Sequence, residues 1–250
     1  KEYNMPKFFT ARENITDSQI IIDNEDANHI RKVLRLNTGD EITVCDGSGI
    51  DYTAVISELG KNSIVCDIKD SNKCDTEPGV EITLYQGLPK AAKMDYIIQK
   101  NTELGICRVV PAKLSRCVVK LEDKSAEEKK IQRWQKIANE AAKQSGRGVI
   151  PEIAMPMTVD EIIDAVKDSD LVFVPYECET KTRLRDIVEE TPDAKHISFI
   201  IGPEGGFDVT EIERFKSAGI KTVTLGKRIL RTETAAEAVV SMLMYAYNEI

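Results

Sequence analysis

The stretch SFIIGPEGGFDVTEIERF, residues 198–215, joins an apolar run to a glycine-rich turn and then to a helix-like pattern. Gly205 and Gly206 would let the backbone approach a ligand closely or adopt a positive φ, whereas Pro203 fixes one torsion and removes a donor. The stretch lacks both the G-x-G-x-x-G spacing of a dinucleotide fold and the Lys-Ser/Thr pair of a phosphate loop. A triphosphate or NAD site is therefore disfavoured, and a tight surface turn is the alternative that this stretch alone leaves open.

A second stretch, LGKRILRTETA, carries charged residues that could act on a ligand. Thr232 is placed to cap a helix that begins near Glu233, and Arg231 stands just before this cap. Arg228 and Arg231 could face an anion, while Glu233 and Glu204 are candidate proton acceptors. Ligands of an open parallel sheet bind outside the carboxyl ends of its strands, so the two stretches would meet there if each follows a strand.

A basic segment indicates a different kind of partner. Between Gln86 and Arg147 the chain has 14 lysines and arginines against 7 acidic residues, although the whole chain has a net charge of −8. Clustered basic residues release counterions from nucleic acids, so this segment could bind RNA, although a solvated helix of mixed charge explains it equally well. An expected helix in this segment carries a basic stripe of Lys129, Arg133, Lys136 and Lys143. We expect Trp134 on the same helix to be a core anchor rather than a platform for stacked bases.

Two composition regimes divide the chain at a polar segment, DSNKCDTEPG, that ends in Pro-Gly and is typical of a linker. We place the boundary between residues 72 and 73. Before it, one basic helix within residues 23–36 interrupts strands expected at 19–23, 41–47, 51–59 and 62–70. Beyond it, strands are expected at 81–87, 107–112, 171–176, 197–201 and 221–225, and helices at 91–104, 126–145, 158–167, 181–189, 208–217 and 233–248. This alternation predicts an α/β domain with a mostly parallel sheet.

Composition narrows the class of protein further. Hydrophobic residues make up 42% and charged residues 30% of the 250 residues, as in ordinary soluble proteins. The six cysteines form no Cys-x-x-Cys pair, so we expect scattered reduced thiols and no metal site. No apolar run is long enough for a membrane span or a signal peptide, which favours a cytoplasmic protein with no membrane partner. The last expected helix is apolar almost all round, which predicts a homodimer, with an internal core helix as the alternative.

Five stretches in this order, HIRKVLRL, QGLPKAAKMDYIIQKNTELG, RWQKIANEAAKQSGR, IGPEGGF and LGKRILRTETA, resemble the RsmE-type bacterial 16S ribosomal RNA uridine-N3 methyltransferases of the SPOUT superfamily. The resemblance spans residues 6 to 248. It implies a PUA-like RNA-binding β-barrel over residues 1–72 and a SPOUT-type α/β methyltransferase domain over residues 73–250, with a C-terminal trefoil knot. General topology rules would have excluded such a knot, because true knots are nearly absent from proteins.

The resemblance also implies the cofactor, the partners and the site. The cofactor would be S-adenosylmethionine, held in the knot loops at a dimer interface, and the substrate would be 16S ribosomal RNA or the small ribosomal subunit. The implied cofactor contacts are Tyr176, Glu177, Ile201, Gly202, Glu204, Gly205, Gly206, Leu225, Gly226, Ile229, Leu230, Arg231, Thr234 and Ala235.

Catalytic and RNA-binding roles complete this hypothesis. We expect Arg231 to stabilise negative charge on the uracil, with Glu233 as the candidate base and Glu204 as its rival. The residues expected to position RNA phosphates are Arg31, Arg35, Lys90, Arg116, Arg133 and Arg147. The alternatives are a non-catalytic RNA-binding or ribosome-assembly module, and a knotted methyltransferase that acts on another RNA position. A non-catalytic module would have no need to keep both the GPEGG loop, residues 202–206, and the ILRTETA loop, residues 229–235.

Overall fold

The computed structural model describes residues 7–90, 92–119 and 123–250, which form two compact units. Residues 1–6, at the start of the predicted first domain, and residue 91, at the start of a predicted helix, lie outside the described part. The first unit comprises Lys1–Glu77 together with Ala142–Ile150, and the second comprises Pro78–Ala141 together with Pro151–Ile250. The expected boundary after residue 72 did not include the second segment of the first unit, because that segment begins with the last turn of a long helix, Lys124–Ser145, and has no composition signal of its own.

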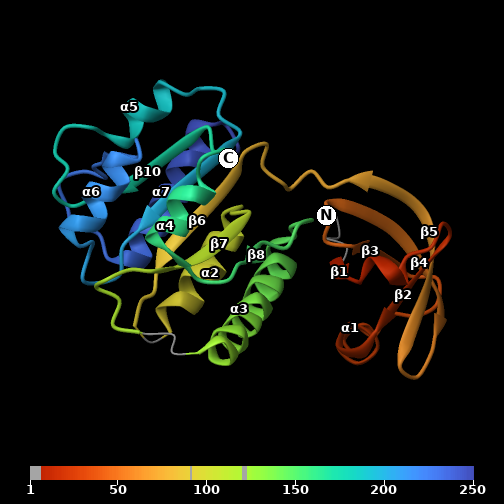
Figure 1. Cartoon of the computed structure of the whole chain (residues 1–250). Coiled ribbons are helices and arrows are strands. Elements are labelled where there is room, and N and C mark those ends of the chain that lie inside the picture. The colour runs from red at the N-terminus through yellow and green to blue at the C-terminus, as the bar shows by residue number, and fades with distance from the viewer. Residues whose placement is uncertain (1–6, 91, 120–122) are drawn as a thin grey trace. The chain divides into compact units, whose positions relative to one another are not determined.

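The first unit is built on a five-stranded sheet in the order β1-β3-β4-β5-β2. The strands are β1 (Lys7–Phe9), β2 (Gln19–Asp23), β3 (Glu41–Cys45), β4 (Ile50–Leu59) and β5 (Ser63–Lys73). Only the pair β1–β3 is parallel, and the other three pairs are antiparallel. Alternate residues of these strands point into one apolar core, and Figure 1 shows the sheet strongly curled. The predicted barrel thus takes the form of a curled sheet. The three-residue strand β1, which was not predicted, forms one edge of this sheet.

The basic helix of the first unit is wound unevenly. It starts as α1 (Asn24–Asn28) and continues as a π-helical segment, η2 (His29–Leu34), which ends at Arg35 with φ = 56°. Ala27 and Ile30 are fully buried, but Leu34 is 37% exposed, although an ordinary helix would place all three on one face. The wider π turn accounts for this difference, because it shifts each later side chain around the axis.

The second unit has a seven-stranded sheet in the order β12-β10-β11-β6-β7-β8, with β9 also paired to β7. Its strands are β6 (Glu81–Gly87), β7 (Arg108–Lys113), β8 (Glu152–Ile153), β9 (Met157–Thr158), β10 (Leu171–Pro175), β11 (His196–Ile201) and β12 (Lys221–Val223). Every strand pair of this sheet is parallel, which confirms the predicted α/β class. The two-residue strands β8 and β9 are too short to give a sequence pattern and were not predicted. The trefoil knot stays a prediction.

Helices alternate with the strands of the second unit (Figure 1). They are α2 (Lys93–Glu103), α3 (Lys124–Ser145), α4 (Val159–Ala165), α5 (Leu184–Glu189), α6 (Val209–Ser217) and α7 (Thr232–Ala246). The last turn of α3, from Ala142 to Ser145, belongs to the first unit. The last helix, α7, packs against α2 and against strands β6 and β11. Its buried residues are mostly small or branched, which allows this close packing at the centre of the sheet.

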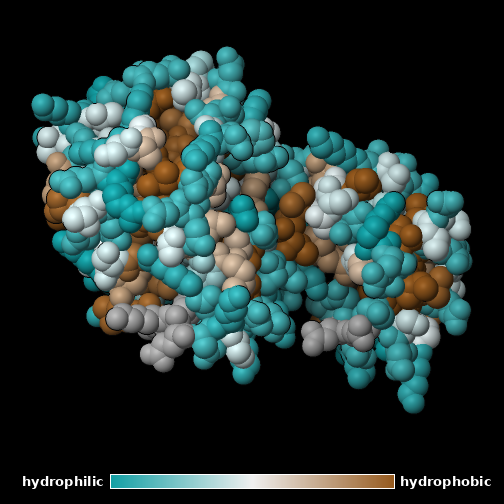
Figure 2. Space-filling model, in the orientation of Figure 1, coloured by the Kyte–Doolittle hydropathy of each residue, from teal (hydrophilic) through white to brown (hydrophobic). Residues whose placement is uncertain are grey.

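No helix in the described ranges is long and apolar enough to cross a membrane. The face shown in Figure 2 is mostly hydrophilic, with apolar residues gathered in separate groups. The apolar side chains of each unit instead form its core, and the larger core lies around the parallel sheet. That sheet therefore provides the rigid support for the loops at its carboxyl edge.

Candidate functional site

The loops that follow β10, β11 and β12 line one pocket of about 550 Å³ in the second unit. These three strands are neighbours in the sheet, so their carboxyl ends open on the same edge. Of the fourteen predicted cofactor residues, thirteen line this pocket. The exception is Thr234, which lies exposed in the first turn of α7. The prediction thus chose residues that are far apart in the sequence and that the fold brings together.

Glycines allow the backbone to come close around this pocket. A Cβ atom on Gly87, at the end of β6, would lie 2.7 Å from the backbone nitrogen of Pro203. Gly206 has φ = 67°, and a Cβ atom there would lie 2.6 Å from Oε1 of Glu177. Only glycine therefore fits both positions without displacing a neighbour, and the GPEGG loop can lie directly against the end of β6 and the loop after β10.

Thr232 joins the elements around the pocket, although in a different way from the predicted one. The helix α7 begins at Thr232 itself, and its N-cap is Arg231, which makes no side-chain cap hydrogen bond. The Thr232 hydroxyl instead donates to the carbonyl oxygen of Gly202 at 2.7 Å and accepts from Nε2 of Gln86 at 2.9 Å. The predicted capping role is therefore wrong, and this buried hydroxyl ties α7 to the GPEGG loop and to β6.

Lys93, a residue that the sequence did not single out for the site, lies between the two candidate bases. Its ammonium is 3.2 Å from Oε1 of Glu204 and 3.2 Å from Oε2 of Glu233. The side-chain hydrogen bond to Glu204 raises the pKa of Lys93. The partners come from the GPEGG loop and from α7, more than a hundred residues away, so no local spacing could reveal this ion pair.

The carboxylate of Glu204 is held by several donors. The backbone N–H of Lys90 donates to its two oxygens at 3.0 and 3.3 Å. Partial burial opposes ionisation of Glu204, but its hydrogen bonds to backbone N–H groups and to Lys93 outweigh burial and lower its pKa. Glu204 is therefore a weak proton acceptor that clamps its own loop to the segment after β6.

A further carboxylate, Glu179, organises the loop after β10. It accepts hydrogen bonds from the backbone N–H groups of Thr180, Lys181 and Thr182, and from the hydroxyl of Thr222 in β12. The backbone N–H of Lys181 and the Thr222 hydroxyl are the main causes that lower the pKa of Glu179 to about 2. This carboxylate fixes the loop that carries the pocket residues Tyr176 and Glu177.

Arg231 and Arg228 line the pocket and are exposed. Within the ranges that the structure describes, neither guanidinium has a carboxylate partner. An arginine without a partner at the mouth of a pocket can bind an anion or a developing negative charge. The role of Arg231 in stabilising the uracil stays a prediction.

Two residues predicted to bind RNA phosphates serve the first unit instead. Arg147 is 3% exposed and pairs with Glu77, with 2.6 Å between Nη2 and the carboxylate. Arg31 donates to the carbonyl oxygens of Gly60 and Lys61 at 2.6 and 2.5 Å, which attaches its helix to the turn between β4 and β5. Burial of Arg147 and the four hydrogen bonds that Arg31 donates leave little of either guanidinium for a phosphate, so the structure does not favour these two assignments.

The other predicted RNA residues keep part of their charge exposed. Arg133 on α3 makes a bidentate ion pair with Asp95, at 2.6 and 2.7 Å. The same carboxylate accepts from the indole nitrogen of Trp134, which is 4% exposed and is therefore the expected core anchor. Arg116 donates to the carbonyl oxygen of Gly205 at 3.1 Å and lies against the GPEGG loop.

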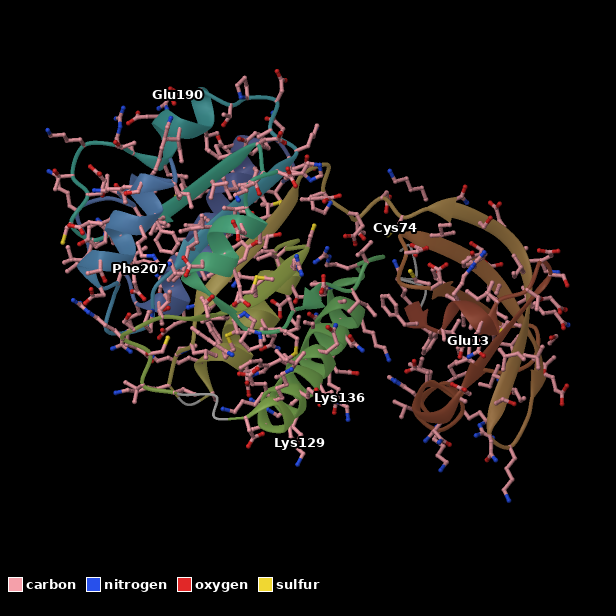
Figure 3. The ribbon with its side chains drawn as sticks, viewed as in Figure 1. Glu13, Cys74, Lys129, Lys136, Glu190 and Phe207 are labelled. Carbon is pink, nitrogen blue, oxygen red and sulfur yellow. The ribbon has the colours of Figure 1, made fainter. Side chains whose placement is uncertain are left out.

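Several basic side chains face solvent. Arg35 ends the helix of the first unit, and Lys90 follows β6 near the GPEGG loop; both are exposed. Figure 3 shows Lys129 and Lys136 on α3, where both residues are exposed. Such unburied cations are the ones that can exchange their counterions for RNA phosphates.

Comparison with known proteins gives matches over nearly the whole chain. Residues 76–244 match a family described as "RNA methyltransferase domain", and residues 22–69 match one described as "RNA methyltransferase PUA domain". A Bacillus subtilis protein named "Ribosomal RNA small subunit methyltransferase E" is 36% identical over 228 residues, which cover 90% of this chain and 89% of that protein. A protein of the same name from Aquifex aeolicus is 33% identical, over 90% of this chain and 93% of its own length.

A solved structure gives the same result in three dimensions. The crystal structure of a ribosomal RNA small subunit methyltransferase E from Neisseria gonorrhoeae, bound to S-adenosyl methionine, superimposes with a TM-score of 0.86. It is 30% identical in sequence, and the match covers 98% of each chain. The curled sheet and the parallel sheet described above are therefore both shared with that protein.

Proposed function

Because this chain belongs to the RNA methyltransferase family, we propose that it transfers the methyl group of S-adenosylmethionine to N3 of a uridine in 16S ribosomal RNA. The observation that carries this proposal is the pocket at the carboxyl edge of the sheet. It gathers the glycine loop after β11 and the loop before α7, the two stretches that the resemblance assigns to the cofactor. The relative from Neisseria gonorrhoeae, of the same fold, is bound to S-adenosyl methionine.

The residues of the pocket fit this cofactor. S-adenosylmethionine has no phosphate and carries a positive sulfonium, so its binding requires close backbone contacts and no phosphate-binding lysine. The pocket offers the glycine backbone, the apolar side chains Ile201, Leu225 and Leu230, and the carboxylates Glu177 and Glu204. These residues would hold the cofactor, which supplies the electrophilic methyl group when bound.

The protein must align the base, favour loss of its N3 proton and exclude water. N3 lies on the Watson–Crick edge, so the target uridine must be unpaired to be reached. Alignment of the reactants can contribute about 7–11 kcal/mol of barrier lowering, which exceeds the usual contribution of one proton acceptor. The pocket backbone would therefore contribute more than any single acid or base. Arg231 would stabilise the uracil anion, and Glu233 is the better candidate base because hydrogen bonds weaken Glu204 as an acceptor.

We also propose a homodimer that forms through α7. One face of this helix is buried in its own unit, through Ala236, Val240 and Leu243 among others. The opposite face leaves Met242 42% and Tyr245 75% exposed, and these side chains are large and apolar. A second copy of the chain would cover them. Light scattering of the purified protein measures the dimer directly.

Ribosomal RNA as the substrate implies a cytoplasmic location. The exposed basic residues of α3 and of the first unit would position the RNA backbone, and sequence recognition would fall to contacts with the unpaired base.

Two measurements test the proposed function. Calorimetry with S-adenosylmethionine should show binding of the purified protein, and the absence of binding would favour a non-catalytic RNA-binding module. Mass spectrometry of ribosomal RNA from cells that lack the gene should show the loss of one methyl-uridine. A methyl group lost from a ribose or from transfer RNA would identify a methyltransferase for another position.

A further inference from the structure

We propose that Lys93 is a positioning residue of the methyl-transfer pocket, which holds the GPEGG loop and the start of α7 together by binding Glu204 and Glu233 at the same time. The inference rests on the proposed function only because that function places S-adenosylmethionine in the pocket. Lys93 lines the pocket but is not needed to touch the reacting atoms.

The geometry gives Lys93 two partners from two different elements. Lys93 is the first residue of α2, Glu204 lies in the loop after β11, and Glu233 lies in the first turn of α7. Both distances are 3.2 Å. A single ammonium with three donors can bind both carboxylates, so it joins two pocket walls that otherwise belong to separate stretches of the chain.

The charges explain why this cation is required. Lys93 stands between two carboxylates, and its removal would leave two like charges close together with no cation between them. The side chains of Lys93, Glu204 and Glu233 are 31%, 28% and 17% exposed, so water would screen this repulsion only in part. The GPEGG loop and the start of α7 would then move apart, and the pocket would have to be closed again at the expense of cofactor binding.

A purely electrostatic role would have the opposite effect. S-adenosylmethionine is positively charged at its sulfonium, and S-adenosylhomocysteine is not. If Lys93 acted only through its charge, its removal would strengthen binding of the sulfonium and leave the neutral thioether unaffected. If Lys93 holds the two walls, its removal weakens binding of both ligands.

The experiment measures both affinities by calorimetry on the full-length protein. For Lys93→Met we expect the Kd for each ligand to rise about fivefold, the size typical of one or two partly exposed ion pairs. Lys93→Arg keeps the cation and should stay near the wild-type values. Adding Glu233→Gln to Lys93→Met removes the repulsion but does not replace the missing bridge, so it should restore part of the lost affinity, which a general loss of stability would not allow.

Lys113→Met is the matched control. Lys113 is 38% exposed and also joins two elements, through an ion pair with Glu127 at 2.6 Å, but it lies outside the pocket. Its substitution should leave both affinities unchanged. Unchanged or tighter binding by Lys93→Met, or a Lys93→Arg variant that binds as weakly as Lys93→Met, would overturn the role of Lys93. If the wild-type protein itself binds no S-adenosylmethionine, the proposed function fails instead.

Discussion

The hydroxyl of Thr232 offers the most direct test of how the pocket is held together. It is buried, with the residue 7% exposed, and it connects α7 with the GPEGG loop and with Gln86 of β6. Thr232→Val keeps the shape of the side chain and removes both hydrogen bonds. The change therefore isolates the polar contacts from the packing.

The expected loss of stability follows from the partners that remain. Nε2 of Gln86 also donates to the carbonyl oxygen of Gly87 at 2.9 Å, so it keeps one acceptor. The carbonyl oxygen of Gly202 loses the hydroxyl, and a buried polar group without a partner costs about 1–3 kcal/mol. We therefore expect the free energy of unfolding of the second unit to fall by about 2 kcal/mol, which lowers the unfolding midpoint by about 5 °C. The same loosening should raise the Kd for S-adenosylmethionine, by at most about thirtyfold.

Tryptophan fluorescence provides the assay. Trp134 is the only tryptophan of the chain and is buried in the second unit, so its emission during urea or thermal denaturation reports on that unit. Thr232→Ser is the control, because it keeps the hydroxyl and loses only a methyl group. If Thr232→Val unfolds like the wild type, or if Thr232→Ser is equally destabilised, the hydrogen bonds do not have the role assigned to them.

Four further predictions address catalysis, pH dependence, RNA binding and stability. Arg231→Ala should strongly lower the rate of methylation of ribosomal RNA and leave the calorimetric Kd for the cofactor within about threefold, since the residue is expected to act on the uracil anion; normal methylation would refute that role. The pKa of Glu179 is lowered from its ordinary value of 4.5 to about 2. Its carboxylate therefore stabilises the fold fully at a pH above 4.5, and this stabilisation is lost as the pH falls toward 2. The unfolding midpoint of Glu179→Gln should therefore decline less than that of the wild type across this range, and equal declines would contradict the argument. Lys136→Ala should reduce the salt slope of RNA binding by about 1 and leave the thermal midpoint unchanged. Arg147→Ala should instead destabilise the first unit by about 3–5 kcal/mol, because it leaves Glu77 without its buried partner. If circular dichroism showed unchanged stability and RNA titrations showed a smaller salt slope, Arg147 would be an RNA-binding residue after all.

The regular elements and the meeting of the two loop stretches could be predicted from local patterns, whereas the individual pocket residues were implied by the family resemblance. The strands predicted at residues 19–23 and 81–87 match β2 and β6 residue for residue. The glycine turn after β11 and the charged stretch after β12 each follow a strand. The rule that parallel sheets bind ligands at their carboxyl edge was therefore enough to bring the two together.

The contacts that hold the pocket could not be predicted, because each joins residues that are far apart in the chain. Thr232 has the side chain and the position of a helix cap, and only the position of Gly202 shows that its hydroxyl is used elsewhere. Lys93 looks like any surface lysine until α2 and α7 are packed together. Arg147 ends a basic segment of the sequence, yet its guanidinium is buried in an ion pair with Glu77. Basic residues in a sequence thus indicate where charge lies, but their carboxylate partners decide which charges remain free.

The division of the first unit has a consequence for synthesis of the chain. This unit needs Ala142–Ile150 in addition to Lys1–Glu77, and Gly148 and Val149 bond to the carboxylate of Glu77 through their backbone N–H groups. A chain emerging from the ribosome cannot complete the first unit until residues 78–141 have also been made. Although amino-terminal domains generally fold first during translation, here the first unit must wait for a large part of the second. The order of folding is therefore set by a segment of nine residues in the middle of the chain.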